Sequence, residues 1–263
     1  MTPVRRVPID LDARIPTGSA NAYVVGRHDG VLVDPARRTD ALDEAVENCT
    51  PAKLLVTHTH PDHVGAVAEY ATEYDLTVLA RAGYERRFER TTGIAPEETV
   101  RDGALIDAGT HTLRAIATPG HAPDHLALDV LCDSGRGLLV GDLAVAEGSV
   151  FVGGQDGDMR GYLTALRRLL ARDPDRLYPG HGPVIEEPDE MLSRLIAHRI
   201  DRERRVERAV QEGASTPQEI VEQVYEKSLD GVRDLARKTV IAHLGKLAVE
   251  GRVEWVNGTA RPA

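Results

Sequence analysis

Cysteine is scarce in this chain, with only Cys49 and Cys132 among its 263 residues. The two lie far apart in the sequence and form no CxxC pair, which excludes a disulfide framework. We expect both thiols to be reduced, with Cys132 buried in the core as the last residue of the apolar run 126–132.

Long apolar runs are lacking as well. No stretch approaches the 18 residues of a membrane span, and the opening residues Met-Thr-Pro-Val-Arg-Arg-Val-Pro contain no signal-peptide core. We therefore expect a cytoplasmic protein with no membrane partner. A hydrophobic content of 41% in 263 residues suits one main domain with a sizeable core and a small appendage.

Lysine is rare too: the chain has 4 lysines against 28 arginines, and its net charge is −10. Acidic surfaces with few lysines are typical of proteins from a salt-loaded cytoplasm, where carboxylates keep the protein hydrated and salt screens their repulsion. A GC-rich genome would also favour arginine. We take a halophilic protein as a hypothesis, and retained folding and activity at low salt would count against it.

The most informative pattern present is Thr-His-Thr-His-Pro-Asp-His at residues 57–63. The apolar run 52–56 before it predicts a buried strand that ends at the first of these polar residues. Imidazole nitrogens suit zinc, and a carboxylate adds charge and a proton acceptor. A chance grouping in an exposed loop is expected in roughly one chain in a thousand or fewer. The pattern therefore indicates a metal site with the ligands His58, His60, Asp62 and His63.

Three further candidate ligands follow glycines at the ends of strand-like stretches: His121, Asp142 and His181. Strands that end in this way can deliver polar residues to a shared rim. The seven candidates comprise five histidines and two aspartates. That is too many for one tetrahedral zinc ion and suits two metal ions that share a bridging group.

The order of these motifs resembles the metallo-β-lactamase fold hydrolases over about residues 15–188. The resemblance implies an α/β fold, the αββα sandwich of that family. It assigns His58, His60 and His121 to a first metal ion, Asp62, His63 and His181 to a second, and Asp142 to the bridge between them. Asn21, Tyr23 and Asp34 also stand at positions like those of the family.

Two aspartates add information to this resemblance. Asp34 either orients a ligand through a hydrogen bond or is an ordinary strand-end residue, and the sequence favours neither. Asp142 stands where the main zinc β-lactamases carry cysteine or serine, which argues against antibiotic cleavage. Only 38 residues lie between Asp142 and His181, too few for the inserted domain of the large nucleic-acid-processing branch.

The chain changes character near residue 188, which predicts a catalytic domain at 1–188 and a second domain at 189–263. Residues 189–212 read as a charged amphipathic helix, and Thr216-Pro217-Gln218-Glu219 is a capping box that opens another helix. A third helix is expected over 232–250, followed by a strand and a turn at Asn257-Gly258. Three helices and a hairpin describe a winged-helix module.

The charge of this module does not by itself indicate a nucleic-acid-binding domain. Residues 190–263 hold 13 basic and 12 acidic side chains, far from a strongly basic signature. Four arginines could contact phosphates, but they alternate with Glu203 and Glu207, which favours a solvated helix face with internal ion pairs. The arginines are Arg202, Arg204, Arg205 and Arg208.

The combination of domains resembles the β-lactamase-like-protein-two branch, whose mitochondrial member is a single-strand endoribonuclease. The stretches 120–125, 240–247 and 250–253 fit that branch. Glyoxalase II is a weaker match, because that family usually follows its last ligand histidine with Glu-Tyr, where this chain has Gly182-Pro183.

We therefore expect a hydrolase with two zinc ions, or manganese or iron in their place, that uses a metal-bridging hydroxide. The expected partner is a single-stranded RNA phosphodiester, slightly favoured over a small-molecule ester or thioester of the hydroxyacylglutathione type. Lesser alternatives are a lactonase, a mononuclear iron persulfide dioxygenase and a non-catalytic nucleic-acid-binding regulator. Asp62 would orient the nucleophile or accept its proton. His125 would donate a hydrogen bond to the substrate, or else be a packed loop residue, and a homodimer is plausible for the long C-terminal helices.

Overall fold

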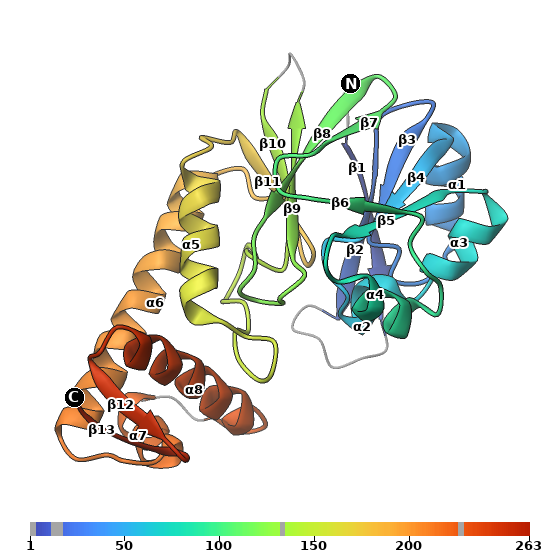
Figure 1. The fold of residues 1–263 in the computed structure, drawn as a ribbon. Helices are drawn as coiled ribbons and strands as arrows, with labels where there is room; N and C mark the ends of the chain where they lie inside the picture. Colours follow the sequence, from blue (N-terminus) through green and yellow to red (C-terminus); the bar gives the residue numbers. More distant parts are fainter. Residues whose placement is uncertain (1–3, 12–17, 132–134, 226–228) are drawn as a thin grey trace.

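Two facing β-sheets with helices on their outer sides form the body of the molecule (Figure 1). The computed structural model describes residues 4–11, 18–131, 135–225 and 229–263. The first sheet has the order β1-β2-β3-β4-β5-β6, and the second the order β11-β10-β9-β8-β7. The strands of the first are β1 (Val4–Asp10), β2 (Ser19–Val25), β3 (Gly30–Val33), β4 (Pro51–Leu55), β5 (Thr77–Arg81) and β6 (Glu98–Val100). Those of the second are β7 (Leu105–Ala108), β8 (His111–Ala117), β9 (Leu126–Leu131), β10 (Gly137–Gly141) and β11 (Arg176–Pro179).

The helices cover the two outer faces of this sandwich (Figure 1). The first sheet is covered by α1 (Asp40–Cys49), α3 (Val67–Glu73) and α4 (Glu85–Thr92), with the short α2 (Pro61–Val64) at its lower edge. The second sheet is covered by α5 (Met159–Leu170) and α6 (Pro188–Gln211). This arrangement is the αββα sandwich that the sequence predicted.

Successive side chains along each strand point to opposite faces of the sheet, and in both sheets each face is buried. In β3, Val31 and Val33 pack between the sheets, whereas Leu32 packs under the helices. In β10, Leu139 faces the space between the sheets and Leu138 faces α5 and α6. A strand with two buried faces reads as a continuous apolar run.

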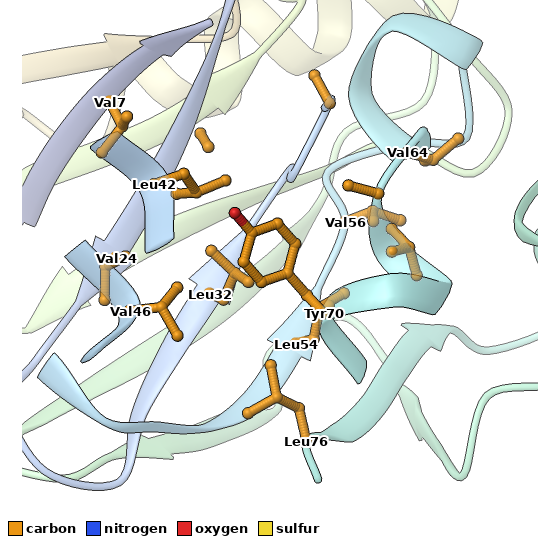
Figure 2. Close-up of a cluster of buried hydrophobic side chains, with 14 of the residues drawn as sticks. Val7, Val24, Leu32, Leu42, Val46, Leu54, Val56, Val64, Tyr70 and Leu76 are labelled. Atoms are coloured by element: carbon orange, nitrogen blue, oxygen red, sulfur yellow. The ribbon is translucent and has the colours of Figure 1, made fainter. Parts of the chain in front are cut away.

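The cluster between the first sheet and its helices shows how this packing is completed (Figure 2). The ring of Tyr70 lies among Leu32, Leu42 and Leu54, all fully buried. Its hydroxyl donates a hydrogen bond of 2.6 Å to Asp43 Oδ1, which satisfies the polar end of an otherwise apolar side chain. Each such leucine contributes about 1.5–3 kcal/mol through burial.

Strand direction places the candidate ligands at one end of the sandwich. β3 runs parallel to β4, and β10 parallel to β11. β9 is antiparallel to both β8 and β10, so β8, β10 and β11 all point the same way. The candidate ligands follow the carboxyl ends of β4, β8, β10 and β11, as the apolar runs had indicated.

The C-terminal part forms the winged helix that the sequence predicted. α7 (Pro217–Val224) begins at a capping box in which Thr216 accepts from the Glu219 N–H, and α8 (Arg233–Val249) follows. The hairpin of β12 (Val253–Val256) and β13 (Thr259–Pro262) completes the module. α6 links it to the body, since its first half packs against α5 and its second half belongs to the winged-helix core.

The expectation of a solvated charged face on α6 is wrong for Glu203 and Glu207, whereas Asp201 is exposed and pairs with Arg205 within the helix. Glu203 is buried, at 4% exposure, and accepts hydrogen bonds from Lys246 Nζ at 2.8 Å and Arg252 Nη1 at 3.0 Å. Glu207 pairs with Arg252 as well. Arg204 and Arg208 are exposed, as expected. The carboxylates pair across the module because Lys246 of α8 and Arg252, just before β12, lie over this face of α6.

Two other expectations concern membrane-spanning helices and the two cysteines. Within the described ranges, no helix combines the length and apolarity needed to cross a bilayer. Cys49 is a free thiol, as expected, whereas Cys132 lies outside the described residues.

Candidate metal centre

Three histidine rings converge beyond the ends of β4 and β8. His60 Nδ1 lies 3.0 Å from His58 Nε2 and 2.9 Å from His121 Nε2. One ring proton can serve only one of these contacts. Zinc–nitrogen bonds of about 2.0–2.1 Å at tetrahedral angles would place three ligand nitrogens roughly 3.3 Å apart. The spacing of these nitrogens therefore fits three ligands around one ion.

Asp62, His63 and His181 form a second group beside the first. α2 carries Asp62 and His63 on one turn, with Pro61 at its first position, which favours the start of a helix. His181 Nε2 lies 3.5 Å from Asp62 Oδ2, and donor atoms of all three residues lie within 4.8 Å of one another. This is the second ligand set that the family resemblance implied.

Asp142 stands between the two groups. Its Oδ2 lies 3.4 Å from His121 Nε2 in the first group, while its Oδ1 lies 3.4 Å from both His63 Nε2 and His181 Nε2 in the second. The structure thus brings all seven candidate ligands together, with one carboxylate oxygen of Asp142 directed to each group.

The polar atoms at the centre of this cluster support the presence of a cation. His63 Nε2 and Asp142 Oδ1 are buried and have no hydrogen-bond partner within the part of the chain that the structure describes. Leaving such atoms unpaired costs about 1–3 kcal/mol each. A divalent ion would satisfy both, so the donor set fits the metal ions that the sequence implied. The His/Asp cluster is suited to divalent metals.

Each candidate ligand histidine uses its other ring nitrogen for a contact that holds the ring in place. His121 Nδ1 lies 2.8 Å from the Phe151 carbonyl, and His181 Nδ1 lies 2.7 Å from the Ser19 carbonyl. His58 Nδ1 lies 3.0 Å from Thr57 Oγ1. Such contacts fix the tautomer, so that the inward nitrogen is free to bind a metal.

The charges at the centre are strongly coupled. Burial holds the pKa of His58 well below its usual value, and the neighbouring His63 lowers it further. Burial would raise the pKa of Asp142, but His63 and His181 outweigh it and hold that pKa well below its usual range. A neutral imidazole and an ionised carboxylate are the forms that bind metal, and the pKa shifts of His58 and Asp142 favour them. At His63 and His181 burial lowers the pKa, but Asp142 outweighs burial and raises it.

The two open questions about Asp34 and His125 receive a structural answer. Asp34 Oδ2 lies 3.2 Å from His63 Nδ1, and Asp34 Oδ1 accepts from the Thr57 N–H at 2.6 Å, so this carboxylate orients the ring of a candidate ligand. His125 is fully buried, and the Asp142 N–H donates to its Nε2 at 3.2 Å. Its Nδ1 contacts Thr118 Oγ1 at 2.9 Å. Both nitrogens of His125 thus have partners inside the protein, which favours the packed alternative.

Asn21 and Tyr23 hold the loop that carries His181. Asn21 Nδ2 donates to the carbonyls of Pro179 and Gly182, each at 2.8 Å. The Tyr23 hydroxyl donates to the Pro179 carbonyl at 2.6 Å. These bonds join β2 of one sheet to the end of β11 in the other, and so fix the position of one ligand.

One further pair of residues lies beside the centre and had no signal in the sequence. Asp156 Oδ2 lies 3.3 Å from His60 Nε2, and Arg87 donates to both oxygens of Asp156 at 2.9 and 2.6 Å. Asp156 is 96 residues from His60 in the chain and belongs to no recognisable motif. Only the fold brings the two together.

Comparison with known families agrees with the fold and the centre. Residues 15–181 match the model of the metallo-β-lactamase superfamily, and residues 216–259 match the β-lactamase-associated winged-helix domain. The chain belongs to the metallo-β-lactamase superfamily.

Among its relatives is a β-lactamase-like protein 2 homolog of Caenorhabditis elegans, 32% identical over 216 residues, covering 79% of this chain and 71% of the relative. An atrochrysone carboxyl ACP thioesterase of Cryptosporiopsis is 23% identical over 258 residues, covering 89% of this chain and 76% of the relative. A crystal structure of a β-lactamase domain protein from Burkholderia ambifaria matches with a TM-score of 0.83 at 21% identity, covering 99% of this chain and 91% of that one. The last likeness shows that the whole fold, winged helix included, is shared.

Proposed function

We propose that this protein is a binuclear metal-dependent hydrolase. The observation that carries the proposal is the position of Asp142, whose two oxygens each lie 3.4 Å from histidine nitrogens of different groups. A carboxylate shared in this way suits two neighbouring cations. We assign the catalytic domain to residues 1–188 and the winged-helix domain to residues 189–263.

The ligand assignment follows the two groups. The first ion would be held by His58, His60 and His121, the second by Asp62, His63 and His181, with Asp142 shared between them. Zinc is the preferred metal because imidazole dominates the ligand set, and manganese or iron is the alternative. When bound, such ions supply an activated water near neutral pH and stabilise the negative charge that develops on the substrate.

The chain's own residues have distinct tasks in this reaction. The side chain of Asp62 is 23% exposed and that of Asp142 is 13% exposed, so Asp62 is the carboxylate more open to solvent. It orients the attacking water or accepts its proton. We propose that His125 holds the backbone at Asp142 and makes no contact with the substrate.

A phosphodiester in single-stranded RNA is our slightly preferred substrate. The β-lactamase-like protein 2 homologs and the winged-helix match support this choice, since winged helices are a common nucleic-acid-binding module. A thioester is the second candidate, supported by the similarity to an acyl-carrier-protein thioesterase.

A parallel assay separates the two candidates. The full chain is incubated at high salt with single-stranded RNA, with an acyl-carrier-protein thioester and with S-lactoylglutathione. His121→Ala is the inactive variant, and His28→Ala is its matched control because His28 is exposed and far from the ligand motifs in sequence. RNA cleavage that His121→Ala abolishes and His28→Ala retains supports the preferred substrate. Thioester turnover with intact RNA overturns that preference, and no hydrolysis of any of the three contradicts the proposal as a whole.

A further inference from the structure

Residues 150–157, in the second half of the connection between β10 and α5, contact both the candidate metal centre and the C-terminal helices. In Figure 1 this segment extends from the lower end of the second sheet to α8. The Phe151 carbonyl contacts His121 Nδ1 at 2.8 Å, and Asp156 Oδ2 contacts His60 Nε2 at 3.3 Å. One segment therefore contacts two of the three histidines in the first group, both from their outer sides.

Arg87 of α4 fixes the end of this segment nearest His60. Its guanidinium donates to Asp156 Oδ1 at 2.9 Å and to Oδ2 at 2.6 Å, a paired geometry that restricts the orientation of the carboxylate. Its Nε also donates to Thr59 Oγ1 at 2.8 Å, in the loop between His58 and His60. The carboxylate that faces His60 is thus held by an arginine that is itself bound to the loop between His58 and His60.

Arg199 of α6 fixes the other end. It is buried, at 3% exposure, and its guanidinium donates to the Val150 carbonyl, next to Phe151. The same group lies over the ring of Tyr162, 5.5 Å from its centroid. A buried arginine is costly unless it is well paired, and here its partners are a loop carbonyl and an aromatic face.

α8 of the winged helix packs against the outer side of residues 150–157. A Cβ at Gly153 would lie 2.8 Å from the backbone C and O of Lys238, so the two backbones are in close contact. A side chain at position 153 would push α8 away from the segment. Helices α6 and α8 therefore contact Val150 and Gly153, which lie in the same short segment as Phe151 and Asp156.

We propose that the C-terminal domain sets the metal affinity of the His58–His60–His121 site through residues 150–157, with Asp156 and Arg199 as positioning residues. This inference rests on the proposed function, in which that site holds a metal ion. Because coupling between sites is reciprocal, a ligand that moves α8 away from the segment would weaken metal binding at this site.

The test measures metal binding by the metal-free full-length chain, titrated with cobalt(II) and followed by its visible absorption. A His181→Ala background isolates the first site, and a His121→Ala background isolates the second. In the first background, Asp156→Asn should weaken cobalt binding about 10- to 100-fold. Arg199→Met, which acts through the backbone, should weaken it roughly 2- to 30-fold, and Arg199→Lys should recover part of the loss.

The His121→Ala background separates an effect on the first site from a general loss of structure. There, both substitutions should leave cobalt affinity unchanged, and Asp156 is partly exposed, so its variant should fold. Glu147→Gln is the matched control, since it removes an exposed carboxylate from the same connection. The inference is overturned if the Asp156 and Arg199 variants leave the cobalt affinity of the first site unchanged, or if they weaken both sites equally. In either case, metal uptake by the wild type leaves the proposed function standing. A wild-type chain that takes up no metal overturns both.

Discussion

Asp34 Oδ2 lies 3.2 Å from His63 Nδ1, in a site where both side chains are buried. Asp34 has a φ of +53°, a left-handed conformation that few residue types other than glycine adopt readily. Its carboxylate also accepts from Thr57 Oγ1 at 2.7 Å, immediately before the first ligand. One residue at the end of β3 therefore supports the loop of His58 and the ring of His63 together.

Asp34→Ala should weaken the second metal site and the fold. The variant removes the partner of His63 Nδ1 and leaves the Thr57 N–H unpaired in the interior. We expect metal affinity to fall about 10- to 100-fold and the free energy of unfolding to fall by ~2 kcal/mol. Metal titration and urea unfolding measure the two effects. Asp40→Ala, on the exposed start of α1, is the control; wild-type metal affinity in Asp34→Ala would show that the carboxylate does not orient His63.

Gly180→Ala should damage the centre directly. The added methyl would lie 2.5 Å from Asp142 Oδ1 and 2.8 Å from His63 Cε1, too close for either atom. We expect metal content and hydrolysis to fall at least tenfold, because a ligand shift of about 1 Å is enough for such a loss. Gly245→Ala is the comparison, since a Cβ there meets nothing within 4 Å and a helical alanine is favoured by about 1 kcal/mol over glycine. Full metal content in Gly180→Ala would contradict the described geometry.

The buried carboxylate of Glu203 should make stability depend on acid pH. Burial would raise its pKa, but His243 and Lys246 outweigh burial and lower it to about 2. A carboxyl whose pKa is lower in the folded state stabilises the protein above its unfolded pKa, about 4.3, and loses that contribution as the pH falls toward 2. Glu203→Gln should therefore unfold more easily than wild type at pH 7, by ~3 kcal/mol, because Lys246 and Arg252 lose a charged partner.

Urea unfolding of both proteins from pH 7 to pH 3 checks this prediction. The difference between them should shrink as the pH falls below about 4.3. Glu254→Gln, in the exposed β12, should behave as wild type over the same range. A difference that stays constant with pH would show that the ionised carboxylate does not contribute.

The sequence indicated the seven candidate ligands because each belongs to a local pattern. The cluster at 57–63 is contiguous, and His121, Asp142 and His181 each follow a strand end that apolar residues reveal. Strand direction then brings these ends together, so a local signal is enough to find a site built from distant segments.

The supporting contacts could not be predicted in the same way. Arg87 and Asp156 are 69 residues apart, and neither stands in a pattern that demands a partner. Glu203 looked like part of a solvated face because the charges around it alternate, whereas the structure buries it under Lys246 and Arg252. Such residues are set by tertiary packing, which periodicity along one helix does not reveal.

Metal content of the purified chain, measured by mass spectrometry beside its hydrolytic activity, tests the binuclear proposal most sharply. We expect about two equivalents of a divalent metal per wild-type chain, and loss of both metal and hydrolysis in Asp142→Ala, because Asp142 faces both ligand groups. A single bound iron would point instead to chemistry of the persulfide dioxygenase type. That result, or full metal content and activity in Asp142→Ala, would contradict the binuclear account.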